Sequence, residues 1–325
     1  MAGEVITADR PIAAIDIGSN SIQITIARLV DREIDIIHRE KDVARLAKAL
    51  GTDRRFSAQT MDRTLSTLRR FRILAESFGA VVRTTATAAV RLARNGGELI
   101  ARAADEIGLD IQLITGADEG RLVLAGVIHG LPELRAAAPL CVDVGGGSTE
   151  LILGQGARAT ILASIPIGSL VVQRRWLGDD PVGRAAVRRA RQHLMSVFAH
   201  RAADMKRAGF SHLIATGGSA QRIARVWRGI GGELTLDVHR TALSKTDIDT
   251  VVARLTRAKT RAERLTIPGL DPDRVDSLLG GALIFQSLGR LLETQDWTVS
   301  MSALRSGLLV DTHHALTGGE SAIAG

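Results

Sequence analysis

The chain has 325 residues, 45% of them hydrophobic and 24% charged, which is typical of a soluble enzyme long enough for two domains. It lacks a run of eighteen apolar residues, so a membrane-spanning helix is excluded. Residues 1–10 do not resemble a signal or transit peptide, and we therefore expect a cytoplasmic protein with no membrane association. The single cysteine, Cys141, excludes disulfides within the chain and is expected to be a small buried strand residue.

The formal net charge is +7, and the 42 basic residues are 37 arginines and only 5 lysines. Arginine forms bidentate pairs with phosphate, so this excess is compatible with a polyanionic ligand. A GC-rich genome would give the same excess without a functional cause. Nucleic acid is not expected as a partner, because aromatic residues make up 3% of the chain and tyrosine is absent, which leaves little for base stacking.

The first part of the chain predicts a three-stranded meander followed by alternating helices and strands. In the longest predicted helix the apolar residues recur with a period near 3.6, from Met61 to Leu74. Strands are expected at 12–17, 22–29, 33–39, 80–84 and 111–114. Helices are expected at 57–78, 87–93, 97–107 and 117–127.

The second part repeats this order. A helix is expected from Pro181, with Asp180 as its N-cap, to about Ala208, and a frayed tail from Gly318 onward. Strands are expected within a hairpin at 140–153 and at 159–165, 212–215 and 297–300. Further helices are expected within 219–264 and at 273–292 and 302–316. Two such halves predict a duplicated α/β fold with a ligand between them.

Two segments carry the same residue types 127 positions apart. They are Asp16-Ile17-Gly18-Ser19-Asn20-Ser21 and Asp143-Val144-Gly145-Gly146-Gly147-Ser148. Each offers a carboxylate for a metal ion or water, glycines that let backbone N–H groups approach an anion, and a hydroxyl donor. The pair indicates a phosphate site that uses both halves.

Apolar residues alternate after each glycine segment, at Ile22, Ile24 and Ile26 and at Leu151 and Leu153. Alternation is typical of a strand, so each segment is predicted to be the tip of a β-hairpin. P-loop and dinucleotide-binding units are excluded, because their glycines open a helix and because neither segment has the required lysine or the full glycine spacing.

With these segments in place, the chain resembles the exopolyphosphatase and guanosine pentaphosphate phosphohydrolase family, of the actin-like fold group. The other matching segments are Thr84 to Arg91 with Asn95, Thr115 to Arg121, Glu150 after Ser148 and Thr149, Ala215 to Ser219, and Ser302 to Gly307. The sequence departs from the family pattern at Gln23, Leu92 and Asp118, and it has no counterpart of the long C-terminal helical domain of the larger members.

The resemblance implies two duplicated actin-like or ribonuclease H-like α/β domains with a cleft between them. Domain I would comprise residues 1–126 plus the returning helix within 303–325, and domain II residues 127–302. The implied activity is removal of the terminal phosphate from inorganic polyphosphate, with Mg²⁺ or Mn²⁺ as cofactor.

The resemblance also implies roles for individual residues. Glu119 matches the catalytic base, and Asp143 and Glu150 are expected to orient water and, with Asp16, to hold the metal. Four carboxylates that face one substrate would repel it without a divalent cation, which is an independent reason to expect one. The expected phosphate-binding residues are Ser19, Asn20, Ser21, Arg91, Gly145, Gly146, Gly147, Ser148, Gly217, Gly218 and Ser219.

Several alternatives stay open at this stage. Guanosine pentaphosphate or tetraphosphate could be the substrate, since the first of these also carries a terminal anhydride. A kinase of the same fold group is disfavoured, because no acceptor pocket or acceptor-side Asp is identifiable. A non-catalytic regulator that binds polyphosphate or nucleotide is the alternative of another class. A homodimer is also expected, with two arginine stripes (184, 188 and 191; 254, 257, 261 and 264) aligned across it.

Overall fold

The computed structural model describes residues 10–31, 33–293 and 296–318. The expectations for the N-terminal segment before residue 10 and for the tail from residue 319 therefore lie outside the described residues. The chain forms two compact units, the first reaching His129 and resuming at Leu304, and the second spanning Gly130–Ala303. Among the described residues, none of the helices combines the length and the apolar character needed to cross a membrane.

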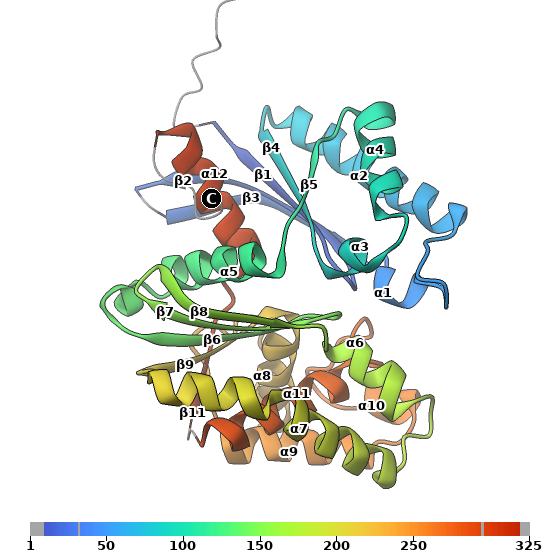
Figure 1. Cartoon of the computed structure of the whole chain (residues 1–325), viewed down its shortest axis with the longest axis vertical. Coiled ribbons are helices and arrows are strands. Elements are labelled where there is room, and N and C mark those ends of the chain that lie inside the picture. The colour runs from blue at the N-terminus through green and yellow to red at the C-terminus, as the bar shows by residue number, and fades with distance from the viewer. Residues whose placement is uncertain (1–9, 32, 294–295, 319–325) are drawn as a thin grey trace, which may run out of the picture. The chain divides into compact units, whose positions relative to one another are not determined.

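The first unit contains a five-stranded sheet in the order β3-β2-β1-β4-β5 (Figure 1). Strands β1, β2 and β3 form an antiparallel meander, and β4 and β5 continue the sheet in parallel with β1. The strands are β1 (Ile12–Ile17), β2 (Ile22–Val30), β3 (Glu33–Asp42), β4 (Val81–Ala86) and β5 (Ile111–Leu113). The central strand β1 is buried along its whole length.

Helices cover this sheet. The long helix α2 buries Met61, Leu65, Leu68 and Phe71 in the same core as the apolar residues of β1 and β2, and Ser57 caps it by accepting a hydrogen bond from the Thr60 N–H. The helices of this unit are α1 (Leu46–Ala49), α2 (Ala58–Ser77), α3 (Ala88–Leu92), α4 (Gly96–Ile107), α5 (Gly116–Gly130) and α12 (Leu304–Leu316).

The second unit repeats the strand order of the first. Its sheet runs β10-β11-β9-β6-β7-β8. Read from the other edge and without the short strand β10, this order is β8-β7-β6-β9-β11, which matches β3-β2-β1-β4-β5 of the first sheet in order and in strand direction. The strands are β6 (Pro139–Val144), β7 (Thr149–Gln155), β8 (Arg158–Ile165), β9 (His212–Thr216), β10 (Ala242–Ser244) and β11 (Asp296–Val299). The predicted duplication is confirmed, and Cys141 lies buried in β6 as expected.

The core of the second unit centres on α11 (Leu278–Leu292), in which all but the residues near the C-terminus are buried. A 3₁₀ turn, η1 (Pro132–Ala136), precedes the sheet, and a π-helical turn, η2 (Gln173–Leu177), follows α6. The other helices are α6 (Ser169–Val172), α7 (Arg184–Ala208), α8 (Gly217–Ile230), α9 (Lys245–Arg257) and α10 (Arg261–Leu265).

Two predicted helix starts are wrong. Helix α7 begins at Arg184 after extended Gly183, and the carboxylate of Asp180 accepts hydrogen bonds from Arg264 and from the Arg261 N–H at the start of α10 instead of capping α7. Helix α11 begins five residues later than predicted, because residues 271–277 form turns in which the Arg274 N–H bonds to the Asp271 carbonyl. A tertiary contact outweighs the local helix signal in the first case, and local turns replace the first helical residues in the second.

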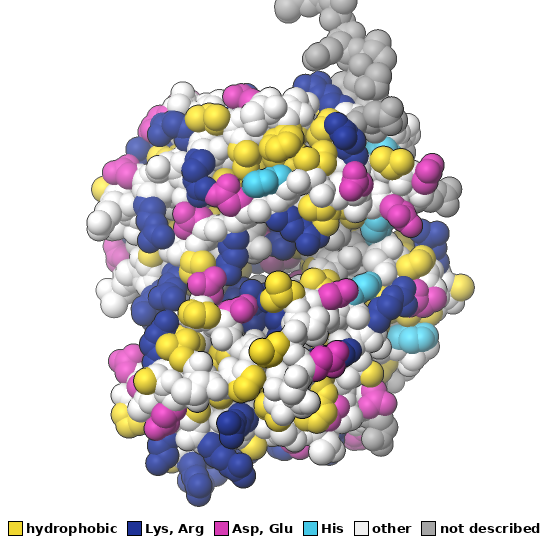
Figure 2. All heavy atoms as spheres, turned by 180° about the vertical axis from the view of Figure 1, so that it is seen from behind, with side chains coloured by type: hydrophobic (Ala, Val, Ile, Leu, Met, Phe, Trp, Pro, Cys, Tyr) yellow, Lys and Arg dark blue, Asp and Glu magenta, His cyan; other side chains and the backbone are white. Residues whose placement is uncertain are grey.

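The arginine stripes are also not continuous. Arg191 turns inward and donates to Gln286 on α11, and Arg264 is buried on a different helix from Arg254 and Arg257. On the face shown in Figure 2, basic and acidic side chains are interspersed. Solvated surface residues therefore account for most of the arginine excess on this face.

Candidate active site

The two glycine segments form the tips of equivalent hairpins. In the first, the Gly18 N–H donates to the Ser21 carbonyl at 3.1 Å, and in the second the Gly145 N–H donates to the Ser148 carbonyl at 3.0 Å. The strand registers agree as well, since Asp16 pairs with Gln23 and Asp143 pairs with Glu150. The prediction of hairpins rather than strand-to-helix turns is confirmed.

Each tip keeps backbone donors available. Among the described residues, no backbone hydrogen bond is donated by the N–H groups of Ser19 and Asn20 or of Gly146 and Gly147. The side-chain amide Nδ2 of Asn20 is buried and likewise lacks a partner. Buried N–H groups without partners are costly, so these tips are built to receive acceptor oxygens such as those of a phosphate.

A contact that the sequence did not reveal supports the second tip. The start of α6 lies directly against it: the Ser169 N–H donates to the Gly145 carbonyl at 2.9 Å and the Leu170 N–H to the Gly146 carbonyl at 3.0 Å. A Cβ on Gly168 would lie 2.6 Å from the Gly146 carbonyl oxygen. The carbonyls of the tip are thus held on one side, which leaves its N–H groups to face a ligand.

Asp16 stands at the end of β1 in an environment that disfavours its charge. It is 8% exposed, and burial raises its pKa to about 6, although the charge of Arg305 acts in the opposite direction. The nearest Arg305 nitrogen is 3.9 Å from Asp16 Oδ2, and the buried Oδ1 has no hydrogen bond to the part of the chain that the structure describes. An unsatisfied buried carboxylate oxygen fits a hard divalent cation, which prefers oxygen ligands.

In the second unit, Asp143 and Glu150 lie opposite each other on neighbouring strands. Glu150 is buried and accepts a hydrogen bond from Ser164 Oγ at 2.8 Å, whereas Asp143 is partly exposed. Within residues 10–31, 33–293 and 296–318, no group of three or more His, Cys, Asp or Glu side chains forms a ready-made metal site. Mg²⁺ is commonly held by one or two carboxylates together with substrate phosphates and water, so separate carboxylates remain compatible with it.

Glu119 lies in the first turn of α5. Thr115 and Asp118 fix the start of this helix, because the Asp118 N–H donates to Thr115 Oγ1 and Thr115 Oγ1 donates to Asp118 Oδ2 at 2.6 Å. The carboxylate of Glu119 lies 3.5 Å from both terminal nitrogens of Arg91 on α3. Arg91 also donates to the Ile114 carbonyl at 2.6 Å, so the structure brings these two predicted residues together.

The segment Gly217-Gly218-Ser219 opens α8 directly after β9, beside Asp143. Gly217 has φ +82°, and a Cβ there would overlap Asp143 Oδ1, so glycine is required both for the backbone and for the close approach. The first N–H groups of a helix have no intrahelical acceptor. The N-cap Thr216 makes no side-chain capping bond; its hydroxyl instead donates to the carbonyls of Ser300 and Ser302.

Arg274 lies against this helix start and was not predicted. It is 8% exposed, and a Cβ on Gly218 would lie 2.6 Å from its Nη2. Its Nε has no hydrogen-bond partner among the described residues. Burial lowers its pKa to about 10, with Arg222 adding to this effect and the nearby carboxylates, including Asp143, opposing it. A buried guanidinium with an unbonded Nε at a helix N-terminus is suited to an anion.

Comparison with known proteins agrees with this arrangement. Residues 25–316 match the model of the Ppx/GppA phosphatase family. The structure is similar to that of an exopolyphosphatase from Cytophaga hutchinsonii, with 27% identity, coverage of 96% of this chain and 99% of the other, and a TM-score of 0.85. It is also similar to the Ppx/GppA family member of Aquifex aeolicus, with 25% identity, 96% and 99% coverage, and a TM-score of 0.80. Because the family match extends over most of the sequence, the chain belongs to the Ppx/GppA phosphatase family.

Proposed function

We propose that the protein is an exopolyphosphatase, which hydrolyses the terminal phosphate from inorganic polyphosphate. The observation that carries this proposal is the repeated hairpin tip, which in each unit places free backbone N–H groups next to a carboxylate. Two such tips suit a ligand with several phosphate groups better than a monoester. The similar protein from Cytophaga hutchinsonii is itself named an exopolyphosphatase.

In the proposed reaction, Glu119 acts as the general base. A water oxygen attacks the terminal phosphorus, its proton passes to the Glu119 carboxylate, and the bond from that phosphorus to the bridging oxygen breaks, so that the shortened polymer leaves as the anion. Arg91, 3.5 Å from the Glu119 carboxylate, would both orient the base and neutralise charge on the phosphate oxygens. A positioned general base contributes roughly 10²- to 10⁴-fold in rate.

The carboxylates of Asp16, Asp143 and Glu150 are the proposed ligands of Mg²⁺ or Mn²⁺. A bound divalent cation would neutralise charge on the phosphate oxygens during bond cleavage. The unsatisfied Oδ1 of Asp16 and the partly exposed carboxylate of Asp143 are the groups most ready to accept it.

The remaining phosphates of the polymer would use a second set of donors. The N-terminus of α8, formed by Gly217, Gly218 and Ser219, offers backbone N–H groups beside the buried Arg274. Ser19, Asn20, Ser21 and Gly145 to Ser148 would hold the terminal phosphate. This division assigns the reacting phosphate to the hairpin tips and the polymer behind it to the helix start.

The test is phosphate release from polyphosphates of several lengths and from guanosine pentaphosphate, with and without divalent cation. We expect cation-dependent release with a higher kcat/KM for polyphosphate. In Glu119→Gln, turnover should fall by about 10²-fold or more with KM nearly unchanged, while Glu98→Gln, an exposed glutamate of the same unit, should behave as wild type. A clear preference for guanosine pentaphosphate would replace the proposed substrate, and binding without turnover would indicate a regulator.

A further inference from the structure

The position of Arg274 depends on the segment that carries it. Residues 271–277 connect α10 to α11 through turns. The guanidinium of Arg274 is buried against Gly218, yet its Nε has no partner among the described residues. No hydrogen bond at Nε therefore fixes the side chain, so the backbone of the segment contributes to its position.

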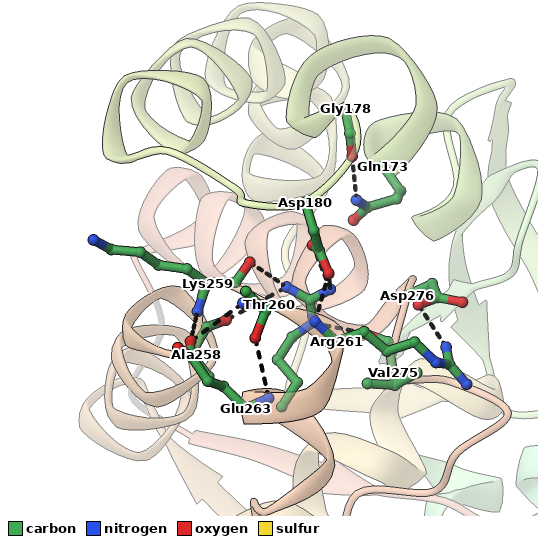
Figure 3. Close-up of polar contacts among 11 residues, drawn as sticks. Gln173, Gly178, Asp180, Ala258, Lys259, Thr260, Arg261, Glu263, Val275 and Asp276 are labelled. Carbon is green, nitrogen blue, oxygen red and sulfur yellow. Dashed lines mark hydrogen bonds and ion pairs between the residues drawn. The ribbon is translucent and has the colours of Figure 1, made fainter.

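Helix α10 holds this backbone on two sides. Arg264 Nε donates to the Val275 carbonyl at 3.1 Å, next to Arg274. Arg261 donates from Nη1 to Asp276 Oδ1 at 2.6 Å and from Nη2 to the Pro272 carbonyl at 3.3 Å. Figure 3 shows the contacts from α10 to Val275 and Asp276. Two arginines one helical turn apart thus clamp both of its ends.

Arg264 is itself fully bonded, in contrast to Arg274. It is 3% exposed, and its Nη1 donates to the carbonyls of Ala258 and Lys259 at 3.4 and 3.2 Å. Its Nη2 bonds to Asp180 Oδ1 and Oδ2 at 2.7 and 3.0 Å. Together with the bond to Val275, these contacts give each of the three guanidinium nitrogens at least one hydrogen bond. Arg264 is therefore held in place and serves as a fixed support.

We infer that Asp180 and Arg264 are positioning residues that hold Arg274 at the start of α8, where it binds an anionic group of the substrate. The identity of that anion as a phosphate of the polymer rests on the proposed function; the support of Arg274 by the Asp180–Arg264 pair does not. The misassigned helix start at Pro181 has the same origin, because the Asp180 carboxylate is bonded to Arg264 and to the Arg261 N–H of α10 rather than to the start of α7.

The experiment measures binding of inorganic tripolyphosphate by calorimetry in the absence of divalent cation, so that binding is separated from turnover. Arg274→Gln should weaken binding roughly ten- to hundred-fold, as expected for a charged hydrogen-bonding group. Asp180→Asn should weaken it roughly three- to ten-fold, because the pair with Arg264 loses its charge. Asp179→Asn, the same change at the exposed neighbouring residue, should leave binding within about two-fold.

The deciding measurement is the double variant. If Asp180 acts through Arg274, Asp180→Asn should have almost no effect in the Arg274→Gln background, since directly coupled residues are non-additive. Arg264→Lys retains the positive charge but not the planar guanidinium with its several N–H donors, so it should also weaken tripolyphosphate binding. Thermal unfolding measurements check that each variant is folded. Additive effects, an unchanged affinity in Asp180→Asn, or no tripolyphosphate binding by the wild type would overturn the inference. Binding without phosphate release would instead overturn the proposed function alone.

Discussion

Replacing Asp16 by Asn should stabilise the metal-free protein while removing its cation response. The pKa of Asp16 is raised from 3.8 to about 6 by burial, so the folded protein holds this proton more tightly than the unfolded chain. A difference of about 2 in pKa, at 1.36 kcal/mol for each, corresponds to about 3 kcal/mol of destabilisation by the ionised carboxylate. The cost is absent below pH about 4, roughly half at pH 5 and complete above pH about 7.

The assay is thermal unfolding of wild type and Asp16→Asn in EDTA at pH 5 and pH 8. At pH 8 the variant should unfold roughly 4 °C higher, with a clearly smaller difference at pH 5. Added Mg²⁺ should raise the unfolding temperature of the wild type more than that of the variant, because the cation binds the folded form. Asp105→Asn, an exposed aspartate on α4, is the control and should show no pH-dependent difference. Equal stability of wild type and Asp16→Asn at pH 8 would refute the reasoning.

Two glycine substitutions test the close approaches described above. Gly217→Ala should lower the free energy of unfolding by about 1–3 kcal/mol, since φ is +82° and the new Cβ overlaps Asp143 Oδ1. The rate of phosphate release should fall as well. Unaltered kinetics would mean that Asp143 can move without consequence. Gly307→Ala should lower the free energy of unfolding, measured by chemical denaturation, by about 1–3 kcal/mol. The reason is that its Cβ would overlap the Leu122 carbonyl where α12 meets α5. Gly97→Ala, with no atom within 4 Å of the new Cβ, is the matched control, and the helix-propensity gain of Ala should leave it as stable as wild type or more so.

The sequence was sufficient to predict the hairpins because their signals are local. Alternating apolar residues at Ile22, Ile24 and Ile26 permit only one buried face, and that face is found packed in the core. The distance of 127 residues between the two tips then predicted the duplication, and the two sheets share their strand order. These features need no information about distant contacts.

The missed residues depend on such distant contacts. Arg274 lies in the first turn of the helix predicted at 273–292, where nothing local indicates a buried position, and the packing of its segment against Gly218 buries it. Arg305 lies within a matching family segment, but its proximity to Asp16 requires α12 to return to the first sheet after the whole second unit. Asp180 before Pro181 carries a strong local cap signal, which the bonds to Arg264 outweigh.

The two hairpins share one frame but differ in the side chains that they carry. Opposite Asp143 stands Glu150, whereas the equivalent position opposite Asp16 is Gln23, whose Nε2 donates to Ser21 Oγ at 3.0 Å. The second tip has three successive glycines before Ser148 and is closely backed by α6, while the first adds the amide of Asn20. Glycines let backbone approach an anion closely, and side-chain donors reach further out. The duplicated hairpin thus has two different forms, the first with more side-chain donors on the unit that carries Glu119 and the second with two facing carboxylates.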